Sequence, residues 1–129
     1  MRQREIKFRA WDTAHKSWYF YGEELNSLAP EIMELNKETQ FSWKDIVLQQ
    51  FTGLKDKNGK EIYEGDILRQ LYMGNWIIAP MIWNEAKAQF GMDAVVEDDG
   101  IPSHIEIVIP KEQAPEIIGN IYENPDLLK

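Results

Sequence analysis

Residues 50–68, QFTGLKDKNGKEIYEGDIL, decide the fold class of this chain. They predict an extended run, a tight turn, a short strand, a Gly-Asp corner and the start of a longer strand. The run from Asp56 through Asn58 to Gly59 suits a type I turn. Aspartate at its first position bonds back to the backbone, and Gly59 supplies positive φ without a Cβ clash. This stretch is a folding signature and carries no chemistry of its own.

The Gly65-Asp66 corner is a second predicted turn, in which the Asp66 carboxylate is expected to bond backbone amides. A corner that enters a long strand and is followed by two hairpins is typical of the opening of an SH3-like barrel, which is an analogy of pattern. Several short strands at this spacing favour a closed or nearly closed barrel. The predicted fold is therefore mainly β: a small SH3-like or partly open β-barrel with an N-terminal β-hairpin and one or two short helices.

Alternating apolar and charged side chains predict a half-buried strand over residues 4–10. A polar loop over 11–17 and a strand over 18–21, ended by a glycine, complete the predicted hairpin. Residues 23–41 suit either a short helix or an insertion loop. The spacing of residues 42–45 is that of a capping box and predicts one helical turn.

Further apolar runs predict the later strands, at residues 46–48, 67–73, 76–83, 88–96, 105–109 and 116–122. Gly74-Asn75 marks a hairpin turn between two of them. Pro80 has no backbone N–H, so we expect its strand to lie at a sheet edge or to be bulged there. Residues 62–123 are expected to hold the barrel, with residues 1–50 packed on it.

The C-terminal segment contains a glycine, Gly119, within its predicted strand and a stop signal, Asn124-Pro125, directly after it. We expect this strand to pair with a barrel strand. The stop signal predicts a final turn that returns Leu127 or Leu128 to the core.

Three blocks carry a family resemblance: REIKFRAWD at residues 4–12, the run at 50–68, and IIGNIYENP at 117–125. Their order and spacing closely resemble the YopX-like proteins of phages and prophages of mainly Gram-positive bacteria. Phe51 departs from the tyrosine that the family often has there. The resemblance implies a mostly β fold with some α and a phage-associated role, and it offers no catalytic residues to carry over.

The chain of 129 residues is predicted to be a single domain, with a hairpin and variable segment at 1–50 and a barrel portion at 51–129. It has no cysteine, which rules out a disulfide framework and a thiolate metal site. No apolar run approaches membrane-spanning length and the N-terminus lacks a signal-peptide core. We therefore expect a protein of the host cytoplasm with no membrane partner.

The net charge of −8 argues against a surface that attracts duplex DNA. Residues 1–16 nevertheless carry five basic and two acidic residues, a net charge of +3, which leaves −11 for the remainder. This basic strand is either an interaction surface or matched internally by a neighbouring acidic strand.

Aromatic residues follow the basic strand and define a candidate binding surface, composed of Arg4, Lys7, Arg9, Trp11, Trp18 and Tyr19. Aromatic side chains beside cations can stack on the bases of a single strand. The same cluster is more often core and cross-strand packing.

The sequence offers little catalytic chemistry, since it has no phosphate loop, nucleophile elbow or metal-binding histidine pair. His15 and His104 are expected to be solvated loop residues. The carboxylates of the three blocks are Asp12, Glu64, Asp66, Glu123 and Asp126. Such groups could hold Mg²⁺ or act as acid and base. The more usual explanation is that Asp66 bonds backbone amides at the corner and that the other carboxylates are solvated. We predict no cofactor.

Three functions follow from these patterns. The sequence favours a non-catalytic binding or protein-interaction module acting on a host or phage protein. The alternatives are a small barrel that binds single-stranded nucleic acid and a metal-dependent enzyme that uses the carboxylates. Homo-oligomer formation is left open.

Overall fold

A computed structural model describes residues 5–24, 43–109 and 113–128. The chain divides into two compact units, Met1–Gly53 and Leu54–Lys129. The fold is mainly β, as predicted, and the only helices in the described ranges are two short 3-10 turns. None of these helices has the length and apolar character needed to cross a membrane. Expectations for Arg4 and for the variable segment over 25–42 lie outside the described residues.

The first unit is built on three antiparallel strands, β1 (Lys7–Asp12), β2 (Ser17–Glu24) and β3 (Ile46–Lys55). The last two residues of β3, from Leu54 on, belong to the second unit. Their order is β2-β1-β3, so the predicted N-terminal hairpin is confirmed. The 3-10 turn η1 (Trp43–Asp45) precedes β3, where one helical turn was predicted. Two predicted limits are wrong, because β1 continues to Asp12 and β2 continues to Glu24 beyond the glycine.

The longer β1 has a local cause in the buried carboxylate of Asp12. Its Oδ1 accepts hydrogen bonds from the backbone amides of Ala14 at 2.9 Å and His15 at 3.1 Å. Its Oδ2 lies 2.6 Å from Nδ1 of His15. Asp12 thus ends the strand and nucleates the turn with one side chain, and the loop starts two residues later than predicted.

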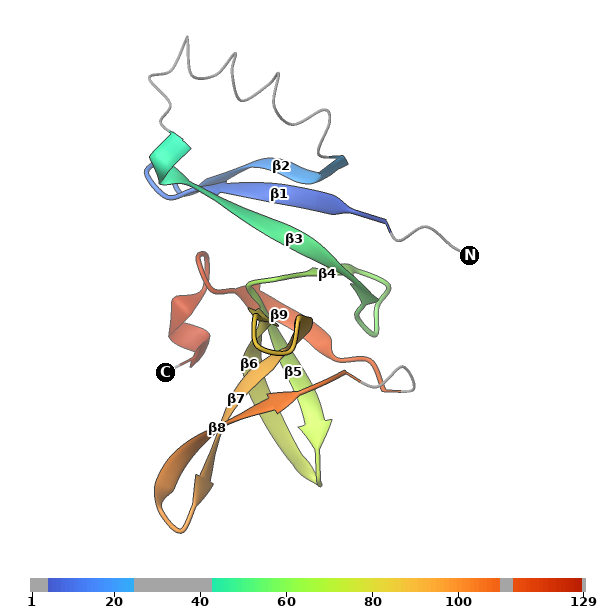
Figure 1. The fold of residues 1–129 in the computed structure, drawn as a ribbon, viewed down its shortest axis with the longest axis vertical. Helices are drawn as coiled ribbons and strands as arrows, with labels where there is room; N and C mark the ends of the chain where they lie inside the picture. The colour runs from blue at the N-terminus through green and yellow to red at the C-terminus, as the bar shows by residue number, and fades with distance from the viewer. Residues whose placement is uncertain (1–4, 25–42, 110–112, 129) are drawn as a thin grey trace. The chain divides into compact units, whose positions relative to one another are not determined.

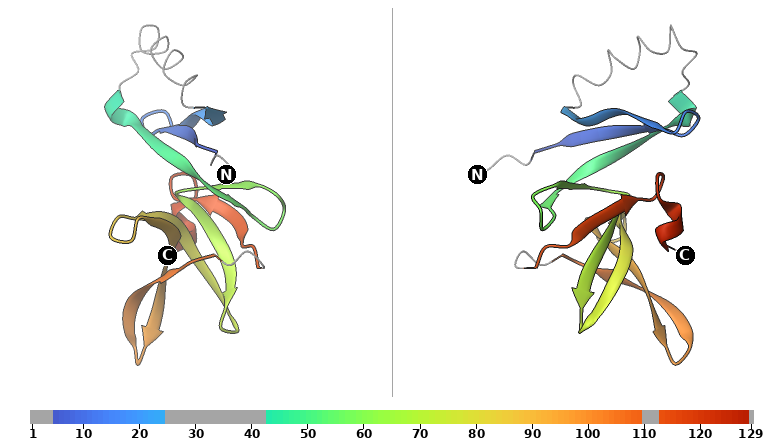
Figure 2. Two further views of the ribbon diagram at one scale, coloured as in Figure 1. Left: turned by 45° about the vertical axis from the view of Figure 1, so that its right-hand side comes forward. Right: turned by 180° about the vertical axis from the view of Figure 1, so that it is seen from behind.

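The second unit contains β4 (Glu61–Tyr63) and a five-stranded antiparallel sheet in the order β8-β7-β6-β5-β9. The sheet strands are β5 (Asp66–Tyr72), β6 (Asn75–Asn84), β7 (Gln89–Asp98), β8 (Ile101–Ile107) and β9 (Glu116–Asn120). The sheet is strongly curled, and the tips of the β5–β6 and β7–β8 hairpins diverge in every view (Figures 1 and 2). This curled sheet confirms the partly open, barrel-like fold, while its SH3-like form stays a prediction.

Pro80 marks the point where β6 changes partner. Residues 75–80 of β6 pair with β5, with Ile67 opposite Pro80, and residues 81–84 pair with β7. The expectation of an edge strand is therefore wrong, because β6 lies between two neighbours. A residue without an N–H is tolerated there because one ladder ends and the next begins at that point.

The core of the second unit is formed by side chains of β4 and of the curled sheet. It contains Ile62, Leu68, Ala79, Met81, Met92, Ala94 and Ile107. Each large apolar side chain of this kind contributes about 1.5–3 kcal/mol to the free energy of folding when it leaves water. The alternation along β5 and β6 sends the remaining side chains to the outer face.

Several predicted boundaries in this unit differ by a few residues. The β5–β6 turn is made by Met73 and Gly74 rather than Gly74-Asn75, since Tyr72 pairs with Asn75. Both turn residues have positive φ, 50° and 82°, as a two-residue type I′ turn requires. His104, predicted in a loop, lies within β8 with its Nδ1 3.1 Å from Oδ1 of Asp93.

The C-terminal strand pairs as predicted, because β9 runs antiparallel to β5. The chain then turns into η2 (Pro125–Leu128), which places the Leu127 side chain over Gly119. A Cβ at Gly119 would lie 2.8 Å from Leu127 Cδ1, so a side chain at this position would force its neighbours to shift. The expected return of Leu127 or Leu128 to the core is only partial, since these leucines remain 41% and 42% exposed.

Candidate functional site

The predicted turn residues lie in a hydrogen-bond network that joins the central and C-terminal blocks. Asp56 is buried, and its Oδ1 accepts from the amides of Asn58 and Lys60, both at 2.9 Å. Its Oδ2 accepts from the amide of Ile117 in β9 at 3.2 Å. Gly59 closes the turn with a φ of 84°, as predicted.

The Gly65-Asp66 corner makes a second link to the same C-terminal segment. The Asp66 carboxylate accepts from the backbone amide of Tyr63 at 2.8 Å, which confirms its predicted corner role. Its other oxygen lies 3.4 Å from Nδ2 of Asn120. The Gly65 carbonyl accepts from the amide of Ile121 at 2.9 Å, and Gly65 has the predicted positive φ of 87°.

The stop signal continues this network. Oδ1 of Asn124 accepts from the amide of Asn120 at 3.2 Å, and the Asn124 carbonyl accepts from the Leu127 amide at 3.1 Å, directly across Pro125. The structure thus brings the predicted turn residues of two distant blocks together as structural groups.

The candidate binding surface on the basic strand is largely inside the first unit. Arg9 and Trp11 are buried, and Lys7 lies 3.0 Å from Glu5. Nε of Arg9 donates to Oε1 of Gln49 at 2.9 Å, and its guanidinium lies 4.3 Å from the ring centroid of Trp18. Arg4 lies outside the described residues, as does the side chain of Tyr19 in β2. The described members of the set therefore act as packing groups, which is the structural alternative raised above.

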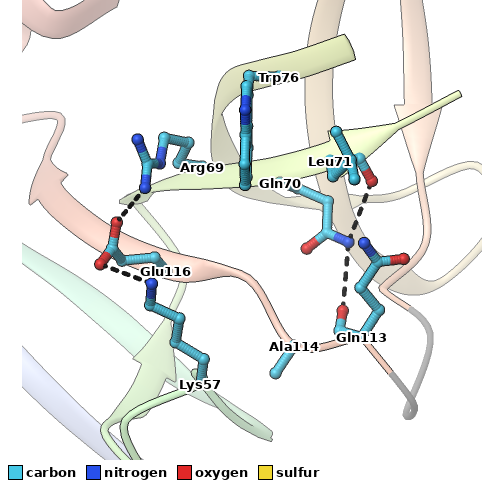
Figure 3. Close-up of a pocket in the computed structure, with 8 residues that line it drawn as sticks. All are labelled: Lys57, Arg69, Gln70, Leu71, Trp76, Gln113, Ala114 and Glu116. Carbon is cyan, nitrogen blue, oxygen red and sulfur yellow. Dashed lines mark hydrogen bonds and ion pairs between the residues drawn. The ribbon is translucent and has the colours of Figure 1, made fainter. Parts of the chain in front are cut away.

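A different cluster, in the second unit, has the properties of a binding site. A cavity of about 100 Å³ lies beside the β5–β9 pair, and Lys57, Arg69, Gln70, Leu71, Trp76, Gln113, Ala114 and Glu116 line it (Figure 3). We call this cavity the Trp76 pocket. Its residues come from the central turn, from the β5–β6 hairpin and from the segment that leads into β9.

Gln70 is the most deeply buried polar side chain of the Trp76 pocket, with 3% of its surface exposed. Its Nε2 donates to the backbone carbonyls of Gln113 at 3.2 Å and Leu71 at 3.4 Å. Because both neighbours are acceptors, the amide nitrogen must face them. The oxygen Oε1 is left without a hydrogen-bond partner among the described residues and points into the pocket (Figure 3).

Three charged side chains line the opposite part of the Trp76 pocket. Glu116 accepts from both cations, with Lys57 Nζ at 3.2 Å from Oε2 and Arg69 Nη2 at 3.2 Å from Oε1. The Arg69 guanidinium also lies 4.7 Å from the centroid of the Trp76 ring. The ion pairs and this cation–π contact fix Arg69 against the tryptophan face.

Trp76 belongs to an exposed apolar face on the outside of the β5–β6 hairpin. In the register, Leu71 stands opposite Trp76 and Arg69 opposite Ile78, so the four side chains share one face. Trp76 is 64% exposed, and Leu71 and Ile78 are exposed as well. An exposed indole held in place by a neighbouring guanidinium is suited to contact another molecule.

Glu106 forms a further polar cluster on β8. Its carboxylate accepts from Nε2 of Gln89 at 2.8 Å and from Nδ2 of Asn84, and Lys87 lies 3.7 Å away. The hydrogen bond from Gln89, followed by those neighbours, lowers the pKa of Glu106. The side chain fills the space over Gly91, where an added Cβ would lie 2.6 Å from it. Its contacts identify it as a cross-strand structural group.

The carboxylates considered for catalysis do not converge. Across the described ranges, no group of three or more His, Cys, Asp or Glu side chains is placed to hold a metal ion. Asp12 and Asp66 instead bind the amides of their own turns. Glu123 and Asp126 are exposed in the C-terminal segment.

Sequence reasoning missed the Trp76 pocket. One signal was available: Gln70 occupies an inward position of β5, where the alternation predicts an apolar residue. A buried glutamine on a core face needs partners, which marks either a hydrogen-bond network or a site. The approach of Gln113 and Glu116 to β5 could not be read from the sequence, since it depends on long-range pairing.

Comparisons with known proteins agree with this fold. The family model of the YopX protein matches residues 7–129. No curated protein matches the chain. The crystal structure of protein EF1440 from Enterococcus faecalis is similar, with a TM-score of 0.51 and 23% sequence identity. The match covers 98% of this chain and 100% of that one. At this identity the likeness shows a shared fold alone.

Proposed function

The chain belongs to the YopX protein family, and from this premise we propose that it is a non-catalytic protein-binding module. In this proposal it is encoded by a phage or prophage and acts in the host cytoplasm on a host or phage protein. The contact surface is the outer face of the β5–β6 hairpin together with the Trp76 pocket.

The arrangement of Trp76 carries this proposal. Tryptophan and arginine are the residues most enriched at the energetic centres of protein interfaces, where they supply large contact area at low entropic cost. Here Trp76 is 64% exposed and already oriented by Arg69, and exposed Leu71 and Ile78 extend the apolar face. An indole that is held in place loses little freedom when a partner binds.

Charge favours a polypeptide over a nucleic acid as the partner. The second unit has seven lysines and arginines against fourteen aspartates and glutamates, a net charge of −7. Lys57 and Arg69, the cations of the Trp76 pocket, both contact Glu116. A phosphate backbone would therefore meet an acidic body and cations that are already neutralised.

The alternative of a single-stranded nucleic-acid-binding barrel is less well supported. It requires basic and aromatic side chains exposed together on one side of the basic strand. Trp11 and Arg9 are buried instead. The metal-dependent enzyme likewise requires converging carboxylates, and the described carboxylates bind turn amides or lie apart.

Affinity capture from phage-infected cells tests the proposal with three forms of the protein: wild type, Trp76→Ala and Trp83→Ala. Trp83 is a matched control, since it is also an exposed tryptophan of β6 but lies in the segment that pairs with β7. We expect one protein to be retained by wild type and Trp83→Ala and lost with Trp76→Ala. Equal retention by all three forms would contradict the proposed surface. Light scattering would show whether the retained protein is a second copy of this chain.

A further inference from the structure

We infer that the Trp76 pocket binds an amide group of the partner polypeptide, whose N–H donates to Oε1 of Gln70. This inference rests on the proposed function, because it names the chemistry that the same surface recognises. It depends on two buried polar atoms of residues that line the pocket, neither of which has a hydrogen-bond partner among the described residues.

The first of these atoms is Oε1 of Gln70, an acceptor. A buried carbonyl oxygen without a hydrogen bond is unfavourable, and a ligand donor would remove that cost. The Gln70 amide cannot rotate to satisfy itself, because its nitrogen is held by the carbonyls of Gln113 and Leu71. The ligand must therefore supply an N–H or O–H.

The second atom is Nε of Arg69, a donor that is buried and without a partner among the described residues. Its guanidinium is held by Glu116 through Nη2, so the orientation of the group is fixed. Nε of Arg69 and Oε1 of Gln70 are thus one buried donor and one buried acceptor without a partner among the described residues. An amide carries the complementary pair, an N–H and a C=O, in one rigid unit.

The pocket, with a volume of about 100 Å³, has room for a small group, since one water molecule needs roughly 10–15 Å³ of such a cavity. One amide with an attached methyl or methylene group fits in this space. A carboxylate or phosphate would add an acceptor beside Gln70 Oε1 and find both cations already paired with Glu116.

An adjoining cavity indicates what lies next to that amide. It has a volume of about 300 Å³, and it shares Gln70, Leu71 and Gln113 with the Trp76 pocket. Its other lining residues are mainly apolar: Tyr72, Met73, Ile107 and Val108. The ligand is therefore an extended peptide that presents an amide to Gln70 and an apolar side chain to this neighbouring cavity.

Nuclear magnetic resonance titration with small amides tests the inference directly. The probes are N-methylacetamide, which has one N–H, and N,N-dimethylacetamide, which has the same acceptor and no donor. We expect N-methylacetamide to produce saturable chemical-shift changes at the Gln70 side-chain amide and the Trp76 indole N–H. We expect N,N-dimethylacetamide to bind at least tenfold more weakly by the same signals. Acetyl-asparagine-methylamide against acetyl-alanine-methylamide then distinguishes a side-chain amide from a backbone amide.

The Gln70→Met variant supplies a second arm, because it keeps the length of the side chain and removes the acceptor. We expect it to lose the N-methylacetamide shifts. Equal shifts from both small amides, or no shifts from either, would overturn the inference without the use of any variant. If Trp76→Ala still loses the captured partner in that case, the proposed function stands and the amide assignment alone fails.

Discussion

Oδ2 of Asp56 accepts a hydrogen bond from the backbone amide of Ile117, 61 residues further along the chain, at 3.2 Å. The same carboxylate organises its own turn through the amides of Asn58 and Lys60. One side chain therefore shapes a local turn and also fixes the C-terminal strand beside it. This double role explains why the central stretch dominates the fold.

Replacing Asp56 with alanine should remove these three hydrogen bonds together. Since hydrogen bonds to a charged group contribute about 1.5–3 kcal/mol each and are not additive, we expect the free energy of unfolding to fall by at least about 2 kcal/mol. Urea denaturation measures this change. Asn58→Ala is the control, because Asn58 uses its backbone amide here, and it should stay within about 0.5 kcal/mol of wild type. Similar losses in both variants would show that the carboxylate has no special role.

Gly59 isolates the cost of backbone strain. Its φ is 84°, and nothing lies within 4 Å of an added Cβ, so a side chain meets no steric obstacle there. Gly59→Val should cost about 1–3 kcal/mol because a β-branched residue resists positive φ. Gly59→Asn should cost less, since asparagine tolerates that region. Equal midpoints of thermal unfolding for the two variants would contradict the turn assignment.

Gly119 isolates the cost of close packing. An added Cβ would lie 2.8 Å from both Asn124 Oδ1 and Leu127 Cδ1. Gly119→Ala should therefore lower the free energy of unfolding by about 1–3 kcal/mol through overpacking. In the double variant with Leu127→Ala, the loss in free energy of unfolding should be smaller than the sum of the losses in the two single variants, because the second change removes one of the clashes. If denaturant unfolding shows that the free-energy changes of the two single variants simply add in the double variant, Leu127 does not contact position 119.

Glu106 should make stability depend on pH in the acidic range. Its pKa in the folded protein is lowered, mainly by the hydrogen bond from Gln89, relative to about 4.3 in an unfolded chain. The folded state then binds fewer protons, so the contribution of Glu106 is complete above the unfolded pKa and is lost as pH falls through the folded pKa.

Urea unfolding between about pH 3 and 6 measures this contribution of Glu106. Gln89→Ala removes the largest cause of the shift and should flatten the pH dependence relative to wild type. Gln113→Ala, an exposed glutamine outside this cluster, is the control. If the free energy of unfolding of Gln89→Ala depends on pH as steeply as that of wild type, another group is responsible for the pH dependence.

The parts of the fold that depend on local backbone geometry could be predicted from the sequence. Asp56, Gly59, Gly65 and Asp66 show their structural role because turn chemistry acts over a few residues. Strand existence follows from alternation for the same reason. The expectation of an edge strand at Pro80 was wrong. The missing N–H is a local property of proline, whereas the change of partner of β6 at that residue depends on long-range pairing.

The candidate site could not be predicted, because its members meet only through long-range strand pairing. Arg9 and Trp18 suggested an exposed basic and aromatic surface, yet the β1–β3 pairing places Gln49 opposite Arg9, and their side chains bond. Conversely, Arg69 and Trp76 look like ordinary strand residues, and Gln70 stands out only as a polar residue at an inward position. Their role depends on the approach of Gln113 and Glu116 to the pocket. Charge and aromatic composition identify the residue types of a site, and the register decides which residues are exposed.

Site-specific photo-cross-linking beside Trp76 tests the central claim, that this face contacts a polypeptide, most directly. A benzophenone amino acid replaces Ile78, an exposed residue on the same face as Trp76, in one form and Trp83 in the other. Each form is irradiated in extracts of phage-infected cells. The account predicts an adduct at position 78 alone, which protease degrades and nuclease leaves intact. An adduct that nuclease degrades, equal adducts at both positions, or none at position 78 would contradict it.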